Sequence, residues 1–134
     1  MIVLDASVVL ELLLNTAVGA MVAHRITPAA ETLHAPHLID LEVAQVLRRY
    51  ARTGMLSGAR AAEALDDLVA LDVTRYPHDV LLPRVWELRH NVSAYDAAYL
   101  ALAEVLPARL MTTDSRLARV PGVRARVEVV RARR

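Results

Sequence analysis

The first ten residues, Met1 to Leu10, read MIVLDASVVL. The apolar run 2–4 is typical of a short buried strand, and Asp5 ends it. Apolar residues then recur at helical spacing, which predicts a helix over 6–14. A carboxylate at the point where a strand becomes a helix is a good N-cap and equally a candidate functional group. The two roles are compatible, because one carboxylate oxygen can cap the helix while the other faces a metal ion.

Short apolar runs and helical stretches alternate along the rest of the chain, and Pro, Gly and capping residues mark their boundaries. Such alternation predicts a mainly parallel sheet that is covered on both faces. Ligands bind these sheets beyond the carboxyl ends of the strands, near the topological switch point. The predicted strands are 2–4, 32–35, 73–76, 109–112 and 127–130, and the predicted helices are 6–14, 17–25, 38–53, 58–71, 79–90 and 94–106, with a helical turn at 115–119.

Length and composition predict one globular α/β domain over residues 1–134, with a hydrophobic fraction of 55%. The chain has no Cys, which excludes disulfides and thiolate metal sites and fits a reducing cytosol. No signal peptide is evident, and no stretch approaches the roughly 20 apolar residues that span a bilayer. We therefore expect a soluble, cytoplasmic protein without a membrane partner.

All 16 basic residues are Arg, and eight of them lie within residues 109–134. Arg suits bidentate contacts with phosphate. The alternative is that residues 131–134 form a solvated, partly disordered Arg-rich tail. The absence of Lys excludes a phosphate-binding P-loop, which needs Gly-Lys-Ser/Thr, and a receiver-type phosphoacceptor domain, which relies on a Lys.

Glu42 lies in the predicted helix 38–53, at the border of its apolar stripe. A Glu at such a border is usually solvated, so this residue alone indicates little. The stripe consists of Ile39, Val43, Val46, Leu47 and Tyr50.

Asp96 and Asp114 stand at the starts of helical segments. Asp96 begins the apolar helix 94–106, and its spacing from Ser93 is that of a capping box. Asp114 follows the strand 109–112 and could cap the turn 115–119. For each acid taken singly, capping is an adequate explanation.

Together, the four acids Asp5, Glu42, Asp96 and Asp114 converge if their junctions share one edge of the sheet. Clustered carboxylates repel one another, and a bound cation would relieve this repulsion. Oxygen ligands without Cys favour Mg²⁺ or Mn²⁺ over zinc. Hard cations held by a few carboxylates are the usual apparatus of phosphodiester cleavage, which is therefore the chemistry that the residues indicate.

Other chemistries have less support. No two of the five His are spaced i, i+4 around a Glu, and we interpret all of them as surface or cap residues. Ser7 and Ser93 have no adjacent His to act as a base. A phosphatase with Asp5 as nucleophile would need a second Asp at position 7.

The acidic motifs, in order, resemble those of PIN-domain nucleases, specifically the VapC-type toxins of bacterial toxin–antitoxin pairs. The resemblance extends from residue 1 to about residue 130. It implies a three-layer α/β/α PIN-like fold with a short, mainly parallel central sheet. The matching segments are MIVLDASVVL at 1–10, HAP at 34–36, LEV at 41–43, LRR at 47–49, SAYDAAYLALA at 93–103 and MTTDSRLA at 111–118.

The same resemblance implies a Mg²⁺- or Mn²⁺-dependent endoribonuclease in which Asp5, Asp96 and Asp114 hold the metal. Glu42 would bind the metal through water or position the attacking water. That water would attack phosphorus in line and leave a 5′-phosphate and a 3′-hydroxyl. Ser7 and Thr113 would be supporting hydroxyls, or simple helix caps.

One position departs from the family pattern. Some members carry a further acid just after the fourth motif's Asp, where this chain has Ser115 and Arg116. This departure argues against a second metal ion.

The implied partners are RNA, a small antitoxin that covers apolar grooves and blocks the acidic pocket, and a second copy of the chain in a homodimer. Helices 38–53 and 58–71 offer apolar faces for the antitoxin, although core packing explains most of those residues. The alternative function is a catalytically inactive PIN-like module that binds RNA or dimerises. The presence of all four acids argues against it.

Overall fold

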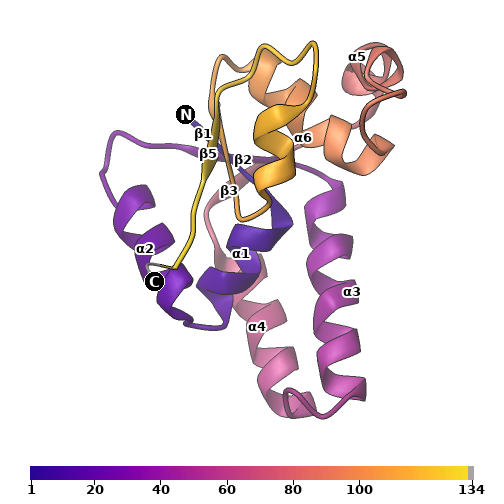
Figure 1. Ribbon diagram of the computed structural model, residues 1–134. Helices are drawn as coiled ribbons and strands as arrows, with labels where there is room; N and C mark the ends of the chain where they lie inside the picture. Colours follow the sequence, from indigo (N-terminus) through magenta and orange to yellow (C-terminus); the bar gives the residue numbers. More distant parts are fainter. Residues whose placement is uncertain (133–134) are drawn as a thin grey trace.

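The computed structural model describes residues 1–132, which form a five-stranded parallel sheet between helices (Figure 1). The strand order is β3-β2-β1-β4-β5, and every neighbouring pair is parallel. The chain proceeds from β1 to β2 and β3 on one side and then returns to β4 and β5 on the other, so the topological switch point lies beside β1. The strands are β1 (Ile2–Leu4), β2 (Leu33–Pro36), β3 (Val73–Tyr76), β4 (Arg109–Thr112) and β5 (Val127–Val129).

The helices lie close to their predicted positions, with one exception. The single helix predicted over 79–90 is wrong, because this segment is divided into η1, a 3-10 turn, and the short helix α5. Pro83 starts α5, since proline lacks the N–H that would continue a helix from Asp79. The bounds are α1 (Ala6–Leu13), α2 (Ala17–Ile26), α3 (Leu38–Arg52), α4 (Gly58–Ala70), η1 (Asp79–Leu81), α5 (Leu82–Glu87), α6 (Ala94–Val105) and η2 (Ser115–Arg119).

The helices form two layers. Helix α6 contacts β1, β2 and β4 and is covered by α5, whereas α1 contacts α2, α3 and α4. The connections from β1 to β3 run toward one edge of the sheet, and the connection from β3 to β4 runs back toward the other edge. Because both kinds of crossover are right-handed, the helices α1 to α4 lie on one face and α5 and α6 on the other. The helices α3 and α4 run as an antiparallel hairpin that extends beyond the sheet (Figure 1). The three-layer α/β/α architecture is thus confirmed.

The core is centred on β1 and α6. The β1 residues Ile2, Val3 and Leu4 are fully buried, and residues 97–103 of α6 are buried on every side. Within residues 1–132, no single helix is long and apolar enough to cross a membrane; only α1 and α2 taken together, bent by 107°, pass by length and composition.

Helices α1 and α2 approach each other closely at Gly19. A Cβ atom added to Gly19 would lie 2.0 Å from the backbone oxygen of Glu11. The Gly19 N–H also donates to the hydroxyl of Thr16, which caps α2. Glycine is therefore required here for packing, since a larger residue would collide with the backbone of α1.

Two of the five His have clear roles. The prediction of a surface or cap position is wrong for His34, which is 5% exposed within β2 and bonds Thr32 through Nε2 and the Tyr76 hydroxyl through Nδ1, both at 2.7 Å. It is confirmed for His78, whose Nε2 accepts a 2.9 Å hydrogen bond from the Leu38 N–H at the start of α3.

The C-terminal arginines divide into paired and exposed ones. Arg109 pairs with Glu31 and Glu128, so part of the basic excess stabilises the sheet edge. In the predicted Arg-rich tail, Arg131 is exposed, whereas Arg133 and Arg134 lie outside the described residues.

Candidate active site

Asp5 follows β1 at the N-cap position of α1, and hydroxyl groups hold its side chain. Its Oδ2 accepts hydrogen bonds from Thr112 Oγ1 at 2.6 Å and Ser7 Oγ at 2.8 Å. Its side chain makes no capping bond to α1, so capping does not explain this residue. Burial raises the pKa of Asp5, the two hydroxyls lower it, and the charge of Asp114 raises it further.

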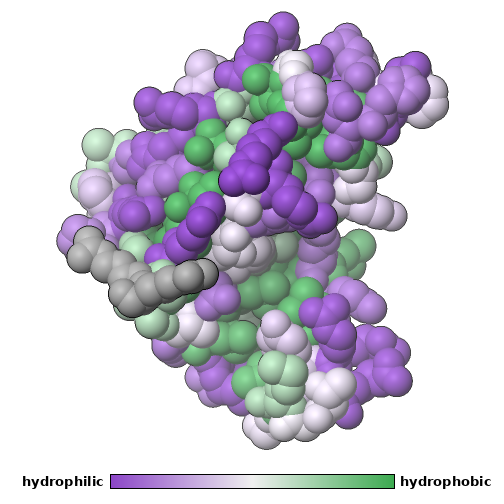
Figure 2. Space-filling view, in the orientation of Figure 1, coloured by the Kyte–Doolittle hydropathy of each residue, from purple (hydrophilic) through white to green (hydrophobic). Residues whose placement is uncertain are grey.

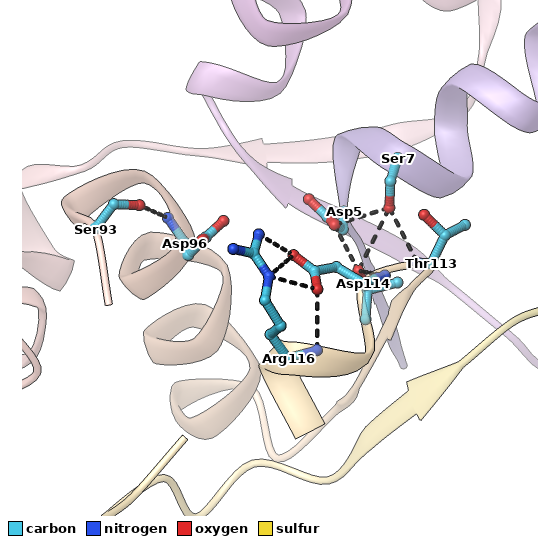
Figure 3. A network of polar contacts seen from close by, with 8 residues as sticks. Asp5, Ser7, Ser93, Asp96, Thr113, Asp114 and Arg116 are labelled. Carbon is cyan, nitrogen blue, oxygen red and sulfur yellow. Dashed lines mark hydrogen bonds and ion pairs between the residues drawn. The ribbon is translucent and has the colours of Figure 1, made fainter. Parts of the chain in front are cut away.

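The two hydroxyls belong to one polar network that joins β1 to the loop after β4 (Figure 3). Ser7 Oγ accepts from the Thr113 N–H, and Thr112 Oγ1 accepts from the Asp114 N–H, each at 3.0 Å. Ser7 therefore has the supporting position that we predicted. The bond expected of the Thr113 hydroxyl comes instead from Thr112, whose role is not apparent from the sequence, and Thr113 contributes its backbone N–H.

Strand register is the reason for this difference. Leu4 of β1 pairs with Met111 of β4, so the next residues, Asp5 and Thr112, lie beside each other. The Thr112 side chain is fully buried, whereas Thr113 lies beyond the strand. Parallel pairing of two segments more than a hundred residues apart in sequence carries no local signal, so the sequence could not distinguish the two threonines.

Glu42 points from α3 toward Tyr99 of α6. The Tyr99 hydroxyl donates a 2.6 Å hydrogen bond to Glu42 Oε1, and Tyr99 is fully buried. Burial raises the pKa of Glu42, the Tyr99 bond lowers it, and the charges of Asp5 and Asp96 raise it. Glu42 is therefore oriented by a specific contact rather than being an ordinary solvated residue.

Asp96 stands in the first turn of α6, where its N–H donates to the Ser93 hydroxyl at 3.2 Å. The Ser93 cap is thus confirmed. Burial raises the pKa of the Asp96 carboxyl, as do the charges of Asp5 and Asp114, whereas Arg116 lowers it. These mutual effects place Asp96 in the same electrostatic neighbourhood as the other two aspartates.

Asp114 caps η2 and forms an ion pair. Its Oδ1 accepts from the Arg116 N–H at 2.9 Å, which confirms the cap, and Arg116 Nη2 bonds Oδ2 at 2.7 Å. The hydrogen bond from the Arg116 side chain is the main cause that lowers the pKa of Asp114. Asp114 thus differs from Asp5, Glu42 and Asp96, whose pKa values are raised.

A pocket of about 540 Å³ lies where these elements meet. Asp5, Glu42 and Asp114 form its acidic end, and apolar side chains of α1 and α3 form its wall. In the space-filling view, apolar residues are visible between α1 and the α3–α4 hairpin (Figure 2). The apolar wall consists of Leu10, Leu38, Leu41 and Val46, with Tyr95 beside it.

The predicted acids therefore share one edge of the sheet, at the switch point, as expected. Within residues 1–132, however, no three Asp, Glu or His side chains stand close enough to hold one metal ion. Asp114 does not face the other acids, because its carboxylate is turned to Arg116 (Figure 3). Carboxylate oxygens are the ligands that a hard cation prefers, and a bound cation would relieve the repulsion between them. Binding the cation requires these side chains to move closer together.

A second pocket, of about 400 Å³, does not offer comparable chemistry. Its one acid, Glu104, accepts two hydrogen bonds from Arg84, and these bonds lower the pKa of its carboxyl against the opposing effect of burial. Since this carboxylate is already neutralised by Arg84, the acidic pocket is the better candidate for an active site.

Comparison with known proteins identifies the family of the chain. The PIN domain family matches residues 2–123. Ribonuclease VapC9 of Mycobacterium tuberculosis is 45% identical over 130 residues, which cover 97% of this chain and 98% of the relative. Ribonuclease VapC1 of the same organism is 42% identical over 130 residues, with coverage of 96% and 97%.

Solved structures show the same fold. PAE2754 from Pyrobaculum aerophilum has a TM-score of 0.69 at 27% identity, over 96% of this chain and 83% of that one. VapBC2 from Rickettsia felis, bound to a DNA fragment from its promoter, has a TM-score of 0.72 at 12% identity, over 98% and 100% of the two chains. Given the family match over nearly its whole length, the chain belongs to the PIN-domain family, in its VapC branch.

Proposed function

We propose that this chain is a metal-dependent endoribonuclease and the toxin of a toxin–antitoxin pair. The observation that carries the proposal is that Asp5, Glu42 and Asp114, from three different segments, line one pocket, and that Asp96 of a fourth segment lies near enough for the charges of Asp5 and Asp114 to raise its pKa. Relatives at 42–45% identity over nearly the full chain bear the name ribonuclease, which supports the same activity here. A cytoplasmic location is part of this proposal.

The donor set supports Mg²⁺ or Mn²⁺ as the cofactor. Asp5, Asp96 and Asp114 would hold it, with Glu42 acting through water. All four donors are carboxylates, and repulsion between them raises the pKa of Asp5, Glu42 and Asp96 in addition to the larger effect of burial. A divalent cation bound there would lower the pKa of a water molecule and neutralise charge on a phosphate oxygen.

The protein's own groups would orient the reaction. Ser7 and Thr112 both bond Oδ2 of Asp5, which fixes the plane of that carboxylate and leaves Oδ1 directed elsewhere. Tyr99 holds Oε1 of Glu42, so Oε2 is the oxygen that would position the attacking water. A raised pKa suits Glu42 to accept a proton from that water as it attacks phosphorus in line. Cleavage would leave a 5′-phosphate and a 3′-hydroxyl.

The apolar wall of the pocket supports the antitoxin part of the proposal. Leu41 is 76% exposed on α3, and Leu10 of α1 lines the same pocket. An antitoxin segment with apolar side chains would cover this wall and at the same time block the acids. One structural neighbour, from Klebsiella pneumoniae, is a toxin–antitoxin complex. A homodimer is also proposed, and sedimentation of the purified protein tests it.

The decisive experiment is cleavage of RNA by purified, antitoxin-free protein. Asp5→Asn and Asp96→Asn should each reduce cleavage on the order of a hundredfold or more, because removing a metal ligand costs at least as much as removing its supporting groups. Asp66→Asn is the matched control, since Asp66 is an exposed acid of α4 outside the pocket. Excess EDTA should abolish cleavage by the wild type.

Two results would contradict the proposal. Cleavage that continues in excess EDTA would exclude metal dependence, and full activity of Asp5→Asn would exclude this pocket. RNA binding without cleavage, together with no Mn²⁺ binding at millimolar concentration, would instead identify a catalytically inactive PIN-like module.

A further inference from the structure

Arg116 places a permanent positive charge inside the acidic cluster. Its Nε lies 3.1 Å from Oδ1 and 3.2 Å from Oδ2 of Asp114, and its Nη2 lies 2.7 Å from Oδ2. The Arg116 side chain is nevertheless 84% exposed. Figure 3 shows the guanidinium between Asp96 and Asp114.

This ion pair contributes little to the fold. Its partners are two residues apart in one loop, so the pair joins no separate elements. The cap of η2 is already made by the Arg116 backbone N–H, at 2.9 Å from Asp114 Oδ1. Exposed ion pairs of this kind contribute little to stability. The pair can therefore be broken at little cost to the fold.

The pair also occupies Asp114 completely. Both carboxylate oxygens accept hydrogen bonds from the Arg116 side chain, and Oδ1 accepts the backbone bond as well. A divalent cation that uses Asp114 must therefore displace the guanidinium. The released side chain would remain tethered at the mouth of the pocket, where a planar guanidinium matches the paired oxygens of a phosphate.

We propose that Arg116 is a positioning residue for the RNA backbone, which neutralises Asp114 in the free protein and transfers to a substrate phosphate when a divalent cation takes over Asp114. This inference rests on the proposed function. It predicts competition between Arg116 and the cation without RNA, and cooperation between them when RNA is bound.

The first test measures Mn²⁺ binding by calorimetry in the absence of RNA. Arg116→Ala should bind Mn²⁺ about two- to fivefold more tightly than the wild type, because an exposed ion pair no longer has to be broken. Arg116→Lys, which keeps the charge but not the planar fork, should fall between the two. The matched control is Arg119→Ala, an exposed Arg of the same 3-10 turn outside the pocket lining, and its Mn²⁺ affinity should equal that of the wild type.

The second test measures the salt dependence of binding to a fluorescently labelled single-stranded RNA of mixed sequence. Ca²⁺ replaces Mn²⁺ here because it takes the same oxygen donors, and gels confirm that the RNA stays intact. In Ca²⁺, Arg116→Ala should reduce the slope of log K against log salt by about 0.7, the value for one phosphate contact on a single strand. In EDTA, where Arg116 remains on Asp114, the two slopes should agree.

The outcomes separate the inference from the proposed function. If the wild type neither binds Mn²⁺ nor cleaves RNA, the proposed function itself is wrong. If it does both, but Arg116→Ala behaves like Arg119→Ala in Mn²⁺ affinity, Arg116 does not compete with the cation. A slope reduction of equal size in Ca²⁺ and EDTA would show that Arg116 contacts RNA without any exchange, which would also overturn the inference.

Discussion

The hydroxyl of Thr112 donates a 2.6 Å hydrogen bond to Oδ2 of Asp5 and links the ends of two neighbouring parallel strands. The same hydroxyl accepts the Asp114 N–H, so one buried side chain contacts two of the four acids. Supporting groups of this kind set the orientation of metal-binding carboxylates.

Thr112→Val should reduce RNA cleavage about ten- to hundredfold while leaving the four acids in place. Loss of the donor also leaves the buried Asp5 carboxylate with one hydroxyl, which should lower the free energy of unfolding by about 1–3 kcal/mol. Initial rates and urea titration measure the two effects. Thr113→Val is the control, because Thr113 contributes its backbone N–H to the network. Equal losses in the two variants would contradict the assignment.

Tyr99→Phe should move the acid limb of the pH–rate profile to higher pH. The Tyr99 hydrogen bond stabilises the ionised form of Glu42 and lowers the pKa of its carboxyl, so its removal raises that pKa further. The proton-accepting form would then be fully populated only at higher pH. The comparison is kcat against pH for wild type and variant, with Tyr50→Phe as control. An unshifted acid limb would mean that Glu42 does not titrate in the reaction.

Gly19→Ala should destabilise the fold by about 3 kcal/mol or more, because the new Cβ would lie 2.0 Å from the Glu11 backbone oxygen and the overlap cannot be relieved by a rotamer change. Gly58→Ala is the matched helical control. No atom lies within 4 Å of a Cβ added there, so that variant should be neutral or slightly stabilised. Thermal unfolding of both proteins tests the prediction, and equal melting temperatures would refute the close contact between α1 and α2.

His34 should make the protein less stable as the pH falls below the pKa that this side chain has in the unfolded chain. Burial, and then the charge of the N-terminus, lower the pKa of folded His34 from 6.5. The unfolded chain therefore binds the proton more readily than the folded protein. The contribution of neutral His34 to stability is fully present above the unfolded-state pKa, and it is lost as the pH falls from there to the folded-state pKa. The expected loss is about 1.4 kcal/mol per pH unit within this window.

Urea titrations at several pH values measure this dependence. His34→Gln should remove the acid-side slope, whatever its effect on absolute stability. His24→Gln is the control because His24 is exposed on α2. A slope that persists in His34→Gln would assign the acid sensitivity to other groups.

Local patterns account for most of the fold that could be predicted from sequence. The run 2–4 forms β1, α6 ends within two residues of its predicted boundary, and Ser93 caps α6 as predicted. The prediction of one helix over 79–90 is wrong, because Pro83 lies in the first turn of α5 and separates it from η1. Periodicity, caps and breakers act over a few residues, so they are readable without tertiary structure.

By itself, the sequence determined which residue types are available for chemistry: four acids in family order, no Cys and no Lys. It also determined the alternation of elements that brings Asp5 and Asp114 to the same edge of a parallel sheet. Only the tertiary structure decided that Thr112 rather than Thr113 holds Asp5, that Tyr99 holds Glu42, and that Arg116 occupies Asp114. The first two depend on strand register and helix packing between distant segments, and the third on one rotamer of an exposed side chain. None of these three contacts can be predicted from the periodicity of the sequence.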